Sequence, residues 1–515
     1  MTDATPSSIE PRPATVLPVS LGDLARLLEA PVVPDSGSDV VVTGITQASA
    51  SVTRGDIYAA LPGSRTHGAR YAAVAARSGA VAAVTDPDGA AECAAAGLAT
   101  LVVERPRRRL GALSAFVYGR PAERLSTLAV TGTQGKTTTT YLMEAGLEAA
   151  GVVPAVVGSI GTRVAGTPVR SALTTPEAPD LHALFAVMVE RSVQACALEV
   201  SSHALVQGRV DGVRFDVATF LNLGRDHLDF HADMEDYYAA KASLFTEQRA
   251  KRAVINVDDA HGRRLIEETS LPVVTFSPSG GDADWRASDP RPGPCGTHVL
   301  VDGPRGLQFA AYSPLSGSFN VANTLAALVT LSVAGVDAET AARGIAGAPG
   351  VPGRMQRVDA GQDFTVLVDY AHKPDALQAV LSAVRPVTDG RVIVVIGAGG
   401  DRDPGKRPLM GEIGARLADV LVVTDDNPRG EDPARIRAQV LAGVGTHGRS
   451  HVHEIGDRGE AIRYAIDTAR SGDTLVVAGK GHETGQEVAG VTHPFDDTVV
   501  VTAAIQVRHG HGEPS

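Results

Sequence analysis

Unbroken apolar runs are the feature that most restricts how this 515-residue chain folds. Examples are "ACALEV" at 195–200, "RVIVVI" at 391–396 and "TLVVA" at 474–478. Strands buried on both faces of a parallel sheet read as continuous apolar runs, whereas half-exposed strands alternate. The runs therefore predict an α/β fold with mainly parallel sheets. Ligands of such sheets bind beyond the carboxyl ends of the strands, so the polar residues after each run become candidate site residues.

The runs fall into three blocks, in keeping with the roughly 150 residues of a typical domain. We predict an N-terminal domain at 19–118, a central domain at 119–349 and a C-terminal domain at 350–508. The Gly- and Pro-containing segment "VYGRPAERLS" marks the first boundary. The Pro-rich leader at 1–18 and the tail at 509–515 are predicted to be disordered.

Composition excludes several classes of protein. The net charge of −12 argues against a nucleic acid or an anionic membrane as the main partner. No apolar run approaches the roughly 18–20 residues that span a bilayer, and no signal peptide is recognisable. Three distant cysteines exclude a disulfide framework. We expect a cytoplasmic, monomeric protein that does not insert into a membrane.

The segment "VTGTQGKTTTT" at 130–140 predicts a phosphate-binding loop between a strand and a helix. Glycine lets backbone N–H groups approach phosphate oxygens, and the helix N-terminus adds partial positive charge. Lys136 would reach the β- and γ-phosphates, and the Thr137 hydroxyl would bind Mg²⁺. A plain strand–helix turn beside a surface lysine is the alternative. Val130 stands where the general pattern has its first glycine, so the loop is a short variant.

This variant loop resembles that of the Mur ligases and of the related folylpolyglutamate synthases. Other motifs follow in the order of the Mur ligase family: "ALEVSSHALVQGRV", "NLGRDHLDFH", "YYAAKASLF", "SFNVANTLAA", "PGRMQRV", "DYAHKPDAL", "GGDRDPGKRPLMG", "DDNPRGEDP" and "AGKGHETGQ". The resemblance covers residues 40–500. It implies a UDP-sugar-binding N-terminal domain, a central P-loop-type ATPase and a Rossmann-like C-terminal domain. It also implies an ATP-dependent enzyme of peptidoglycan precursor synthesis that joins a carboxylate to an amine through an acyl phosphate.

The resemblance assigns residues to ATP and to two Mg²⁺ ions. The ATP-binding residues would be Gly132, Thr133, Gln134, Gly135, Lys136, Thr137, Thr138, Asn320, Arg354 and Asp369. The residues around the metal would be Thr137, Glu199, His227 and Lys241, and the catalytic residues would be Lys136, His227, Lys241 and Arg354. A surface ion pair for Arg354 and Asp369, a helix cap for Asn320 and a structural His227 are the alternatives.

Lys241 has two interpretations. On an amphipathic helix a lysine is normally a solvated cation whose stem lies along apolar surface. In the Mur ligases, however, the lysine of this motif reacts with CO₂ to form a carbamate that binds Mg²⁺. Such a reaction requires the neutral amine. The resemblance alone therefore implies a carbamylated Lys241.

The carboxylate substrate implied by the resemblance is UDP-N-acetylmuramoyl-L-alanyl-D-glutamate. Its candidate contacts are Gln47, Ser49, Ser64, Arg65, Thr66, Thr174, Thr175, Ser201, Gln207 and Arg209. Arg209 suits a substrate with a free carboxylate and a pyrophosphate. Relatives often have "DSR" where this chain has "QASAS", so Gln47 and Ser49 match the family less well, and a structural turn is the alternative for 64–66.

The incoming amino acid is either meso-diaminopimelate or L-lysine in this family. Diaminopimelate carries a second carboxylate, for which the guanidinium fork of arginine is suited. The "DNPR" segment at 426–429 matches the diaminopimelate-recognition motif, although an Asn-Pro turn after a strand is the structural alternative. The candidate contacts are Arg402, Asp426, Asn427, Pro428, Arg429, Gly479 and Glu483.

Other functions stay open at the level of the sequence. A folylpolyglutamate synthase would share the ATP chemistry, but the separate N-terminal block and "DNPR" argue against it. A non-catalytic nucleotide-binding regulator is disfavoured because Lys241, Arg354 and Asp369 are retained. The His451 and His453 pair in "HVH" fits a strand or a polar loop better than a metal site.

Overall fold

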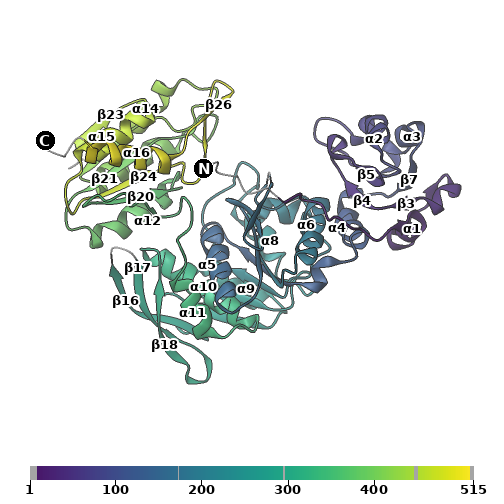
Figure 1. Cartoon of the computed structure of the whole chain (residues 1–515), viewed down its shortest axis with the longest axis horizontal. Coiled ribbons are helices and arrows are strands. Elements are labelled where there is room, and N and C mark those ends of the chain that lie inside the picture. The colour runs from purple at the N-terminus through teal and green to yellow at the C-terminus, as the bar shows by residue number, and fades with distance from the viewer. Residues whose placement is uncertain (1–8, 172, 294–295, 446–450, 511–515) are drawn as a thin grey trace. The chain divides into compact units, whose positions relative to one another are not determined.

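The computed structural model describes residues 9–171, 173–293, 296–445 and 451–510 (Figure 1). The chain forms two compact units. The first unit comprises Met1–Arg286, Gly303–Arg305 and Leu325–Gly344, and the second comprises Ala287–Asp302, Gly306–Thr324 and Ile345–Ser515.

The N-terminal part of the first unit is built on a small sheet with the strand order β2-β7-β6-β5-β4. The strands β4 to β7 are parallel, and β2 pairs with β7 in the antiparallel direction. The sheet strands are β2 (Val32–Val33), β4 (Gly44–Thr46), β5 (Asp56–Ala60), β6 (Ala82–Thr85) and β7 (Ala99–Val102), and β1 (Val19–Ser20) pairs with β3 (Val41–Val42). The helices are α1 (Leu21–Leu28), α2 (Ala72–Ser78), α3 (Pro87–Ala95) and α4 (Pro106–Val117).

The central part of the first unit contains a larger sheet, with β8 between β12 and β13. Its strands β9, β12, β8, β13, β14 and β15 are parallel neighbours in that order, and β10 and β11 extend the β9 edge as an antiparallel ribbon. The strands are β8 (Ser126–Thr131), β9 (Pro154–Gly158), β10 (Gly161–Val164), β11 (Thr167–Val169), β12 (Ala195–Glu199), β13 (Val217–Phe220), β14 (Ala253–Asn256) and β15 (Val273–Ser277). The helices are α5 (Lys136–Ala149), α6 (Ala178–Glu190), α7 (Ser202–Val206), α8 (Met234–Ala242) and α9 (Ala260–Glu268).

The register of these strands brings the predicted motifs to one edge. Glu199, the last residue of β12, pairs with Val130 of β8, and Phe220, the last residue of β13, pairs with Thr131. The glycine loop and the segments after β12 and β13 therefore all begin at the carboxyl edge of the sheet, where ligands of α/β folds bind.

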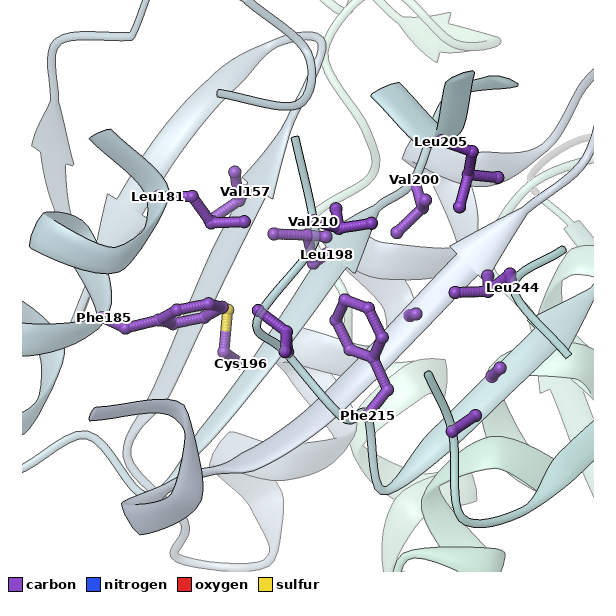
Figure 2. Packing of buried hydrophobic residues seen from close by; sticks show 14 of the residues in the cluster. Val157, Leu181, Phe185, Cys196, Leu198, Val200, Leu205, Val210, Phe215 and Leu244 are labelled. Atoms are coloured by element: carbon purple, nitrogen blue, oxygen red, sulfur yellow. The ribbon is translucent and has the colours of Figure 1, made fainter. Parts of the chain in front are cut away.

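A large apolar cluster covers one face of this sheet (Figure 2). Phe185 of α6 lies against Cys196 of β12, while Leu181 of the same helix lies near Val157 of β9. All four side chains are almost fully buried. Burial of this kind stabilises the fold by roughly 25 cal/mol per Å² of apolar surface, so the apolar runs that indicate strands also anchor the sheet.

The chain continues from β15 into β16 (Trp285–Gly293), β17 (Gly296–Asp302) and β18 (Gln308–Ser313), followed by α10 (Ser318–Val333) and α11 (Ala338–Ala346). The strands β17 and β18 form an antiparallel pair.

The second unit is built on a sheet with the strand order β19-β20-β24-β21-β22-β23, parallel except for β19. Its strands are β19 (Gln356–Arg357), β20 (Thr365–Asp369), β21 (Val392–Ile396), β22 (Val420–Val423), β23 (His451–Glu454) and β24 (Thr474–Ala478), and β25 (Gly485–Val488) with β26 (Val491–Pro494) forms a hairpin. The helices are α12 (Pro374–Val384), α13 (Lys406–Leu417), α14 (Pro433–Leu441), α15 (Arg458–Thr468) and α16 (Asp497–Gly510).

The leader is more ordered than the sequence predicts. Residues 1–8 lie outside the described part, but Ile9 forms a β-bridge with Val169. The Arg12 guanidinium donates to the Thr53 hydroxyl at 2.7 Å and to Asp56 at 2.9 Å. The disorder predicted for 1–18 therefore does not hold at Ile9 and Arg12, where specific contacts fix a chain that cannot form a core of its own.

The C-terminal tail also differs from its prediction. Helix α16 extends to Gly510, so the predicted tail at 509–515 begins inside a helix, and residues 511–515 lie outside the described part. Among the described residues, none of the helices combines the length and the apolar character that a bilayer crossing requires.

Candidate functional site

The glycine loop joins β8 to α5 as the sequence predicts. Gly135 precedes the helix with φ +88°, a left-handed conformation that favours glycine. The Lys136 ammonium folds back and donates to the carbonyl oxygens of Gly132 at 2.8 Å and Thr133 at 3.2 Å. Helix α5 has no side-chain cap at its first turn. Because the first N–H groups of a helix have no partner within it, this end can bind an anion.

Glu199 ends β12 with only 1 % of its surface exposed. Its Oε1 atom accepts from the Ser159 backbone N–H at 2.8 Å, and its Oε2 atom accepts from the Ser159 hydroxyl at 3.1 Å. A side chain at Gly158 would stand 2.1 Å from Oε1, so only glycine fits beside this carboxylate. Hydrogen bonds of this kind offset the cost of burying the charge.

Lys241 is buried, with 1 % of its surface exposed, so its interpretation as a solvated surface cation is wrong. Its Nζ atom donates to the carbonyl oxygen of Gly132 at 2.9 Å and lies 4.6 Å from the centroid of the Tyr237 ring. Lys136 donates to the same carbonyl. Two lysines from different helices therefore meet at the glycine loop, which periodicity along α8 does not reveal.

His227 follows β13 in the loop that leads to α8. Its backbone is left-handed, with φ +53°, and its Nε2 atom lies 3.3 Å from the Asp226 carboxylate. The His203 ring contacts it edge-on with centroids 4.8 Å apart and stacks on Phe230 at 4.0 Å. The left-handed backbone and the neighbouring rings fix the orientation of the His227 imidazole.

These residues fit a magnesium ion that is shared with phosphates. Magnesium prefers oxygen ligands, and it commonly combines one or two carboxylates with nucleotide phosphates and water. The Glu199 carboxylate and the Thr137 hydroxyl are suitable donors at the same sheet edge. Within the described ranges there is no group of three or more His, Cys, Asp or Glu side chains that could form a cage for a metal.

Five of the predicted contacts to the carboxylate substrate form one network in the central part of the first unit. The Thr175 hydroxyl donates to the carbonyl oxygen of Glu199 at 2.8 Å and lies 3.4 Å from the Ser201 hydroxyl. The Arg209 guanidinium donates to the Thr175 carbonyl at 3.1 Å and to the Gln207 side chain at 2.6 Å. Thr174 joins through the Ser159 hydroxyl at 3.1 Å. The tertiary structure thus brings these five residues together beside Glu199.

Arg209 also has a partner that the sequence did not indicate. Its Nε atom lies 2.9 Å from the Glu177 carboxylate, which Arg107 approaches to 3.4 Å. A hollow of about 510 Å³ lies nearby, and its walls include Gln207, Arg107 and Arg249. A substrate carboxylate that binds Arg209 would therefore share it with Glu177.

The other predicted substrate contacts lie on loops after strands of the N-terminal sheet. Gln47 and Ser49 follow β4, and Ser64, Arg65 and Thr66 follow β5. Ser64 and Arg65 are exposed, and Thr66 accepts a hydrogen bond from Arg70 at 3.3 Å. Their place beyond the carboxyl ends of parallel strands suits a ligand, but they do not join the Thr175 network.

In the second unit, Arg354 and Asp369 lie at adjoining turns. The Arg354 guanidinium lies over the Tyr370 ring at 4.3 Å. The Asp369 carboxylate accepts backbone N–H bonds from Met355 at 2.6 Å and Ala371 at 2.8 Å, and burial raises its pKa. Asp369 therefore fixes the turn that carries Arg354, a role that the sequence did not predict.

Asn320 is 2 % exposed, and its amide group is engaged with neighbouring residues. It donates to the Ser316 carbonyl at 2.8 Å and accepts from Asn323 at 3.1 Å. Asn320 is the third residue of α10 and donates to a carbonyl, so these bonds are not those of the helix cap that was the alternative. The adenine contact stays a prediction.

The "DNPR" segment follows β22 and contacts the segment after β24. Asn427 donates to the Glu483 carboxylate at 2.9 Å, and the fully buried Lys480 donates to Asn427 at 3.0 Å and to Glu483 at 3.2 Å. The Asp426 Oδ2 atom is buried without a hydrogen-bond partner among the described residues. Gly479 adjoins it with φ +119°, and a side chain there would stand 2.6 Å from Oδ2. The arrangement offers oxygen acceptors for an ammonium group.

Arg429 is held at the end of this segment in a left-handed conformation, with φ +51°. Its Nη1 atom donates to the Gly400 carbonyl at 2.8 Å, and its Nε atom lies 3.3 Å from the Glu487 carboxylate. Backbone bonds to the β25–β26 hairpin fix the same residue. Arg402 lies on the exposed loop after β21, near Gly399. The guanidinium of Arg429 is thus oriented before any ligand binds.

The predicted residues therefore assemble into separate groups in the two units. Glycine-loop residues, Glu199, His227 and Lys241 belong to the first unit, whereas Arg354, Asp369 and the "DNPR" group belong to the second. Sequence reasoning missed Asn222, Glu177, Lys480 and Glu487. Lys480 lies in the motif "AGKGHETGQ" and Asn222 opens the motif "NLGRDHLDFH", so both had a usable signal in the sequence, whereas the contacts of Glu177 and Glu487 depend on tertiary folding.

Models of known families match most of the chain. The Mur ligase family, catalytic domain model matches residues 41–118, and the Mur ligase middle domain model matches residues 130–331. The Mur ligase, glutamate ligase domain model matches residues 353–481. The chain belongs to the Mur ligase family. Mur ligases are ATP-dependent ligases, and so is this chain.

Individual Mur ligases resemble the chain over nearly their whole length. A UDP-N-acetylmuramoyl-L-alanyl-D-glutamate–2,6-diaminopimelate ligase of Streptomyces avermitilis is 53% identical over 504 residues, which cover 97% of this chain and 99% of the relative. A solved structure of a ligase with the same title is 34% identical, with a TM-score of 0.70, and the match covers 96% of this chain and 100% of that one. The predicted α/β fold with three Mur ligase domains is confirmed.

A folylpolyglutamate synthase of Mycobacterium tuberculosis, solved with ADP and AMPPCP, is more distant. It is 19% identical, with a TM-score of 0.58, and the match covers 79% of this chain and 96% of that one. This similarity extends to the fold alone.

Proposed function

We propose that this Mur ligase adds meso-2,6-diaminopimelate to UDP-N-acetylmuramoyl-L-alanyl-D-glutamate. The γ-phosphoryl group of ATP passes to the D-glutamate carboxylate, so that an acyl phosphate forms and ADP leaves. The neutral amine of diaminopimelate then attacks the acyl carbon and forms the C–N bond. The C–O bond to phosphate breaks, and the nitrogen releases one of its two protons as inorganic phosphate leaves. The protein aligns the reactants and stabilises their negative charge. The reaction takes place in the cytoplasm, and the enzyme acts as a monomer with domains at 19–118, 119–349 and 350–508.

The main support for this proposal is that the Arg429 guanidinium is held in a fixed position. Asn427, two residues earlier in the same segment, donates a hydrogen bond to Glu483. Diaminopimelate presents an ammonium and a carboxylate at each end. Arg429, with Arg402, suits the carboxylates, and Glu483 with Asp426 suits an ammonium. Lysine lacks the second carboxylate, so one of the two guanidinium groups would have no substrate carboxylate to bind.

ATP occupies the glycine loop at residues 132–138, with Lys136 on its phosphates. Arg354 supplies a further positive charge, and Asp369 and Asn320 contact the nucleoside. The UDP-dipeptide lies along Thr174, Thr175, Ser201, Gln207 and Arg209, with its uridine end at 47–49 and 64–66. Support comes from the shared network around Thr175 and from the place of the N-terminal residues after parallel strands.

Lys241 is a carbamate in the active enzyme. The Lys241 ammonium first loses a proton, CO₂ then adds to the neutral amine, and an N–C bond forms as a second proton is released, so that a cation becomes an anion. Support comes from the burial of Lys241 and from its place beside Gly132. Mg²⁺, when bound by Thr137, Glu199, His227 and this group, neutralises phosphate charge.

Release of inorganic phosphate from the purified enzyme tests the function. The enzyme receives ATP, magnesium and UDP-N-acetylmuramoyl-L-alanyl-D-glutamate, with either meso-diaminopimelate or L-lysine. We expect turnover with diaminopimelate to exceed turnover with lysine by at least 100-fold in kcat/KM. Equal turnover with lysine contradicts the choice of amino acid. Turnover with a folate and glutamate in place of these substrates contradicts the whole assignment.

A further inference from the structure

Asn222 lies two residues beyond the end of β13, and its backbone and side chain both hold the glycine loop. The Thr133 N–H donates to the Asn222 carbonyl oxygen at 3.0 Å and to its Oδ1 atom at 3.1 Å. The Gln134 N–H donates to the same Oδ1 atom at 3.0 Å, and Asn222 Nδ2 donates to the Gln134 carbonyl at 3.2 Å. One side chain thus satisfies three polar groups of two consecutive loop residues.

We propose that Asn222 is a positioning residue for nucleotide binding, because it fixes the shape of a phosphate loop that lacks the usual first glycine. In the longer loop, glycines let successive backbone N–H groups curl around a phosphate. This loop begins after Val130 and Thr131, both fully buried in β8, so little free backbone is left for such a curl. The side-chain amide of Asn222 instead fixes the backbone of Thr133 and Gln134 from outside the loop.

The contacts of Asn222 divide the N–H groups of the loop into two sets. Those of Thr133 and Gln134 donate to Asn222. Those from Gly135 onward lie at the start of α5, where N–H groups have no acceptor within the helix. The second set therefore binds the phosphates, whereas Thr133 and Gln134 act through the shape of the loop.

The hydroxyl of Thr133 extends the same connection toward α8. It accepts from the Gly224 N–H at 3.0 Å and lies 3.1 Å from the Tyr237 hydroxyl. The Tyr237 ring in turn lies 4.6 Å from the Lys241 ammonium. Asn222 and Thr133 thus tie the phosphate loop to the segment that carries His227 and Lys241.

The inference rests on ATP use, and not on the identity of the amino acid. Hydrogen–deuterium exchange of the loop and binding of Mg-ATP to the full chain need no ligation. An enzyme that binds Mg-ATP but prefers lysine would overturn the proposed function and leave this inference intact.

Exchange at the N–H groups of Thr133 and Gln134 is the first test. Asn222→Ala removes the side-chain acceptor, so we expect exchange of the peptide over residues 132–135 to accelerate at least tenfold without nucleotide. Asn222→Asp keeps an acceptor oxygen, so we expect its exchange to stay within about threefold of that of the unchanged protein. Equal acceleration in both variants, or none in the Ala variant, would overturn the inference. If the Ala variant does not fold, Asn222→Ser takes its place, because it also lacks the amide.

Nucleotide affinity is the second test. We expect Asn222→Ala to raise the Kd of Mg-ATP and the KM for ATP at least tenfold, with the KM values for both other substrates within about twofold. A KM for ATP within twofold of the original value in a folded variant, or an equal rise for all three substrates, contradicts the inference.

Gln194→Ala is the matched control. The Gln194 side chain also accepts a backbone N–H, that of Val153 at 3.0 Å, but it lies before β12 at the opposite end of the strand from Glu199. We expect it to change neither the loop exchange nor the KM for ATP.

Discussion

Lys241 and Arg429 are single charged residues whose surroundings determine what they can do. Lys241 stands in the Ala-rich run "YYAAKAS" and Arg429 in the polar run "DDNPRGED", and neither run reveals these surroundings. In the folded chain, Lys241 is buried against the glycine loop and Arg429 is clamped between Gly400 and Glu487. Burial makes an unmodified lysine costly, and a fixed guanidinium loses little entropy on binding a carboxylate.

Replacing Lys241 with alanine tests the proposed carbamate. We expect kcat to fall at least 100-fold, because the group that would bind the metal is lost. Carbon-13 NMR of the protein equilibrated with labelled bicarbonate should show a carbamate signal that Lys241→Ala abolishes. Lys251→Ala is the control, since Lys251 is half exposed and pairs with Asp216 at 2.6 Å. An unchanged spectrum in the Lys241 variant would contradict carbamylation there.

Replacing Arg429 with alanine tests the choice of amino acid. Charge-assisted hydrogen bonds contribute about 1.5–3 kcal/mol, so the KM for diaminopimelate should rise about 10- to 100-fold. The KM for the UDP-dipeptide should stay within about twofold. Arg435→Ala, on the exposed face of α14, is the control. If diaminopimelate still binds as before, Arg429 does not recognise its carboxylate.

At the scale of elements, the carboxyl ends of the parallel strands carry nearly all of the candidate chemistry. The strands could be located from their apolar runs, and α5 begins at Lys136, directly after the predicted glycine loop. The contacts between the ends of different strands could not be predicted. Glu199 is held by Ser159 after β9, and Asn427 after β22 meets Glu483 after β24, because sheet order and register set those neighbours.

The ion pair of Arg458 and Asp497 joins four elements of the second unit. Both side chains are fully buried, with Nη2 and Oδ2 2.6 Å apart. Arg458 starts α15, Asp497 starts α16, and the guanidinium also donates to the Ala478 carbonyl at the end of β24 and lies 3.5 Å from the Asp425 carbonyl after β22.

We expect Arg458→Met to destabilise the second unit by about 3–5 kcal/mol, because it leaves the Asp497 carboxylate buried without its partner. Urea unfolding followed by circular dichroism measures the loss. Arg291→Ala breaks an exposed pair with Asp289 and should change stability little. Equal, small effects of both changes would show that the buried pair does not stabilise the unit.

At the scale of the whole molecule, buried histidines should make stability depend on pH. His182 in α6 is fully buried, and burial lowers its pKa from 6.5 to about 4. Its Nε2 atom lies 3.1 Å from the Asp211 carbonyl. In the second unit, burial, together with Lys373 and Lys406, lowers the pKa of His372 to about 4.

Between about pH 6.5 and pH 4 the unfolded chain binds protons that the native His182 and His372 do not. The free energy of unfolding should therefore be highest above pH 6.5 and fall as the pH falls, by up to about 3 kcal/mol for His182. Denaturant unfolding at a series of pH values measures the slope. His182→Gln should flatten it, and His451→Gln at an exposed site should not. An equal slope for all three proteins contradicts the assignment to His182.

The sequence by itself determined the α/β class, the strand runs and the motifs that mark a Mur ligase. These features are local, because burial on both faces dictates apolar runs and phosphate binding dictates glycine before a helix. Only the tertiary structure decided that Lys241 is buried, that Asn222 holds the glycine loop and that Lys480 lies between Asn427 and Glu483. Those contacts join residues more than fifty positions apart, or the ends of different strands. Whether these contacts form depends on the order and register of the strands, and the sequence alone does not specify either.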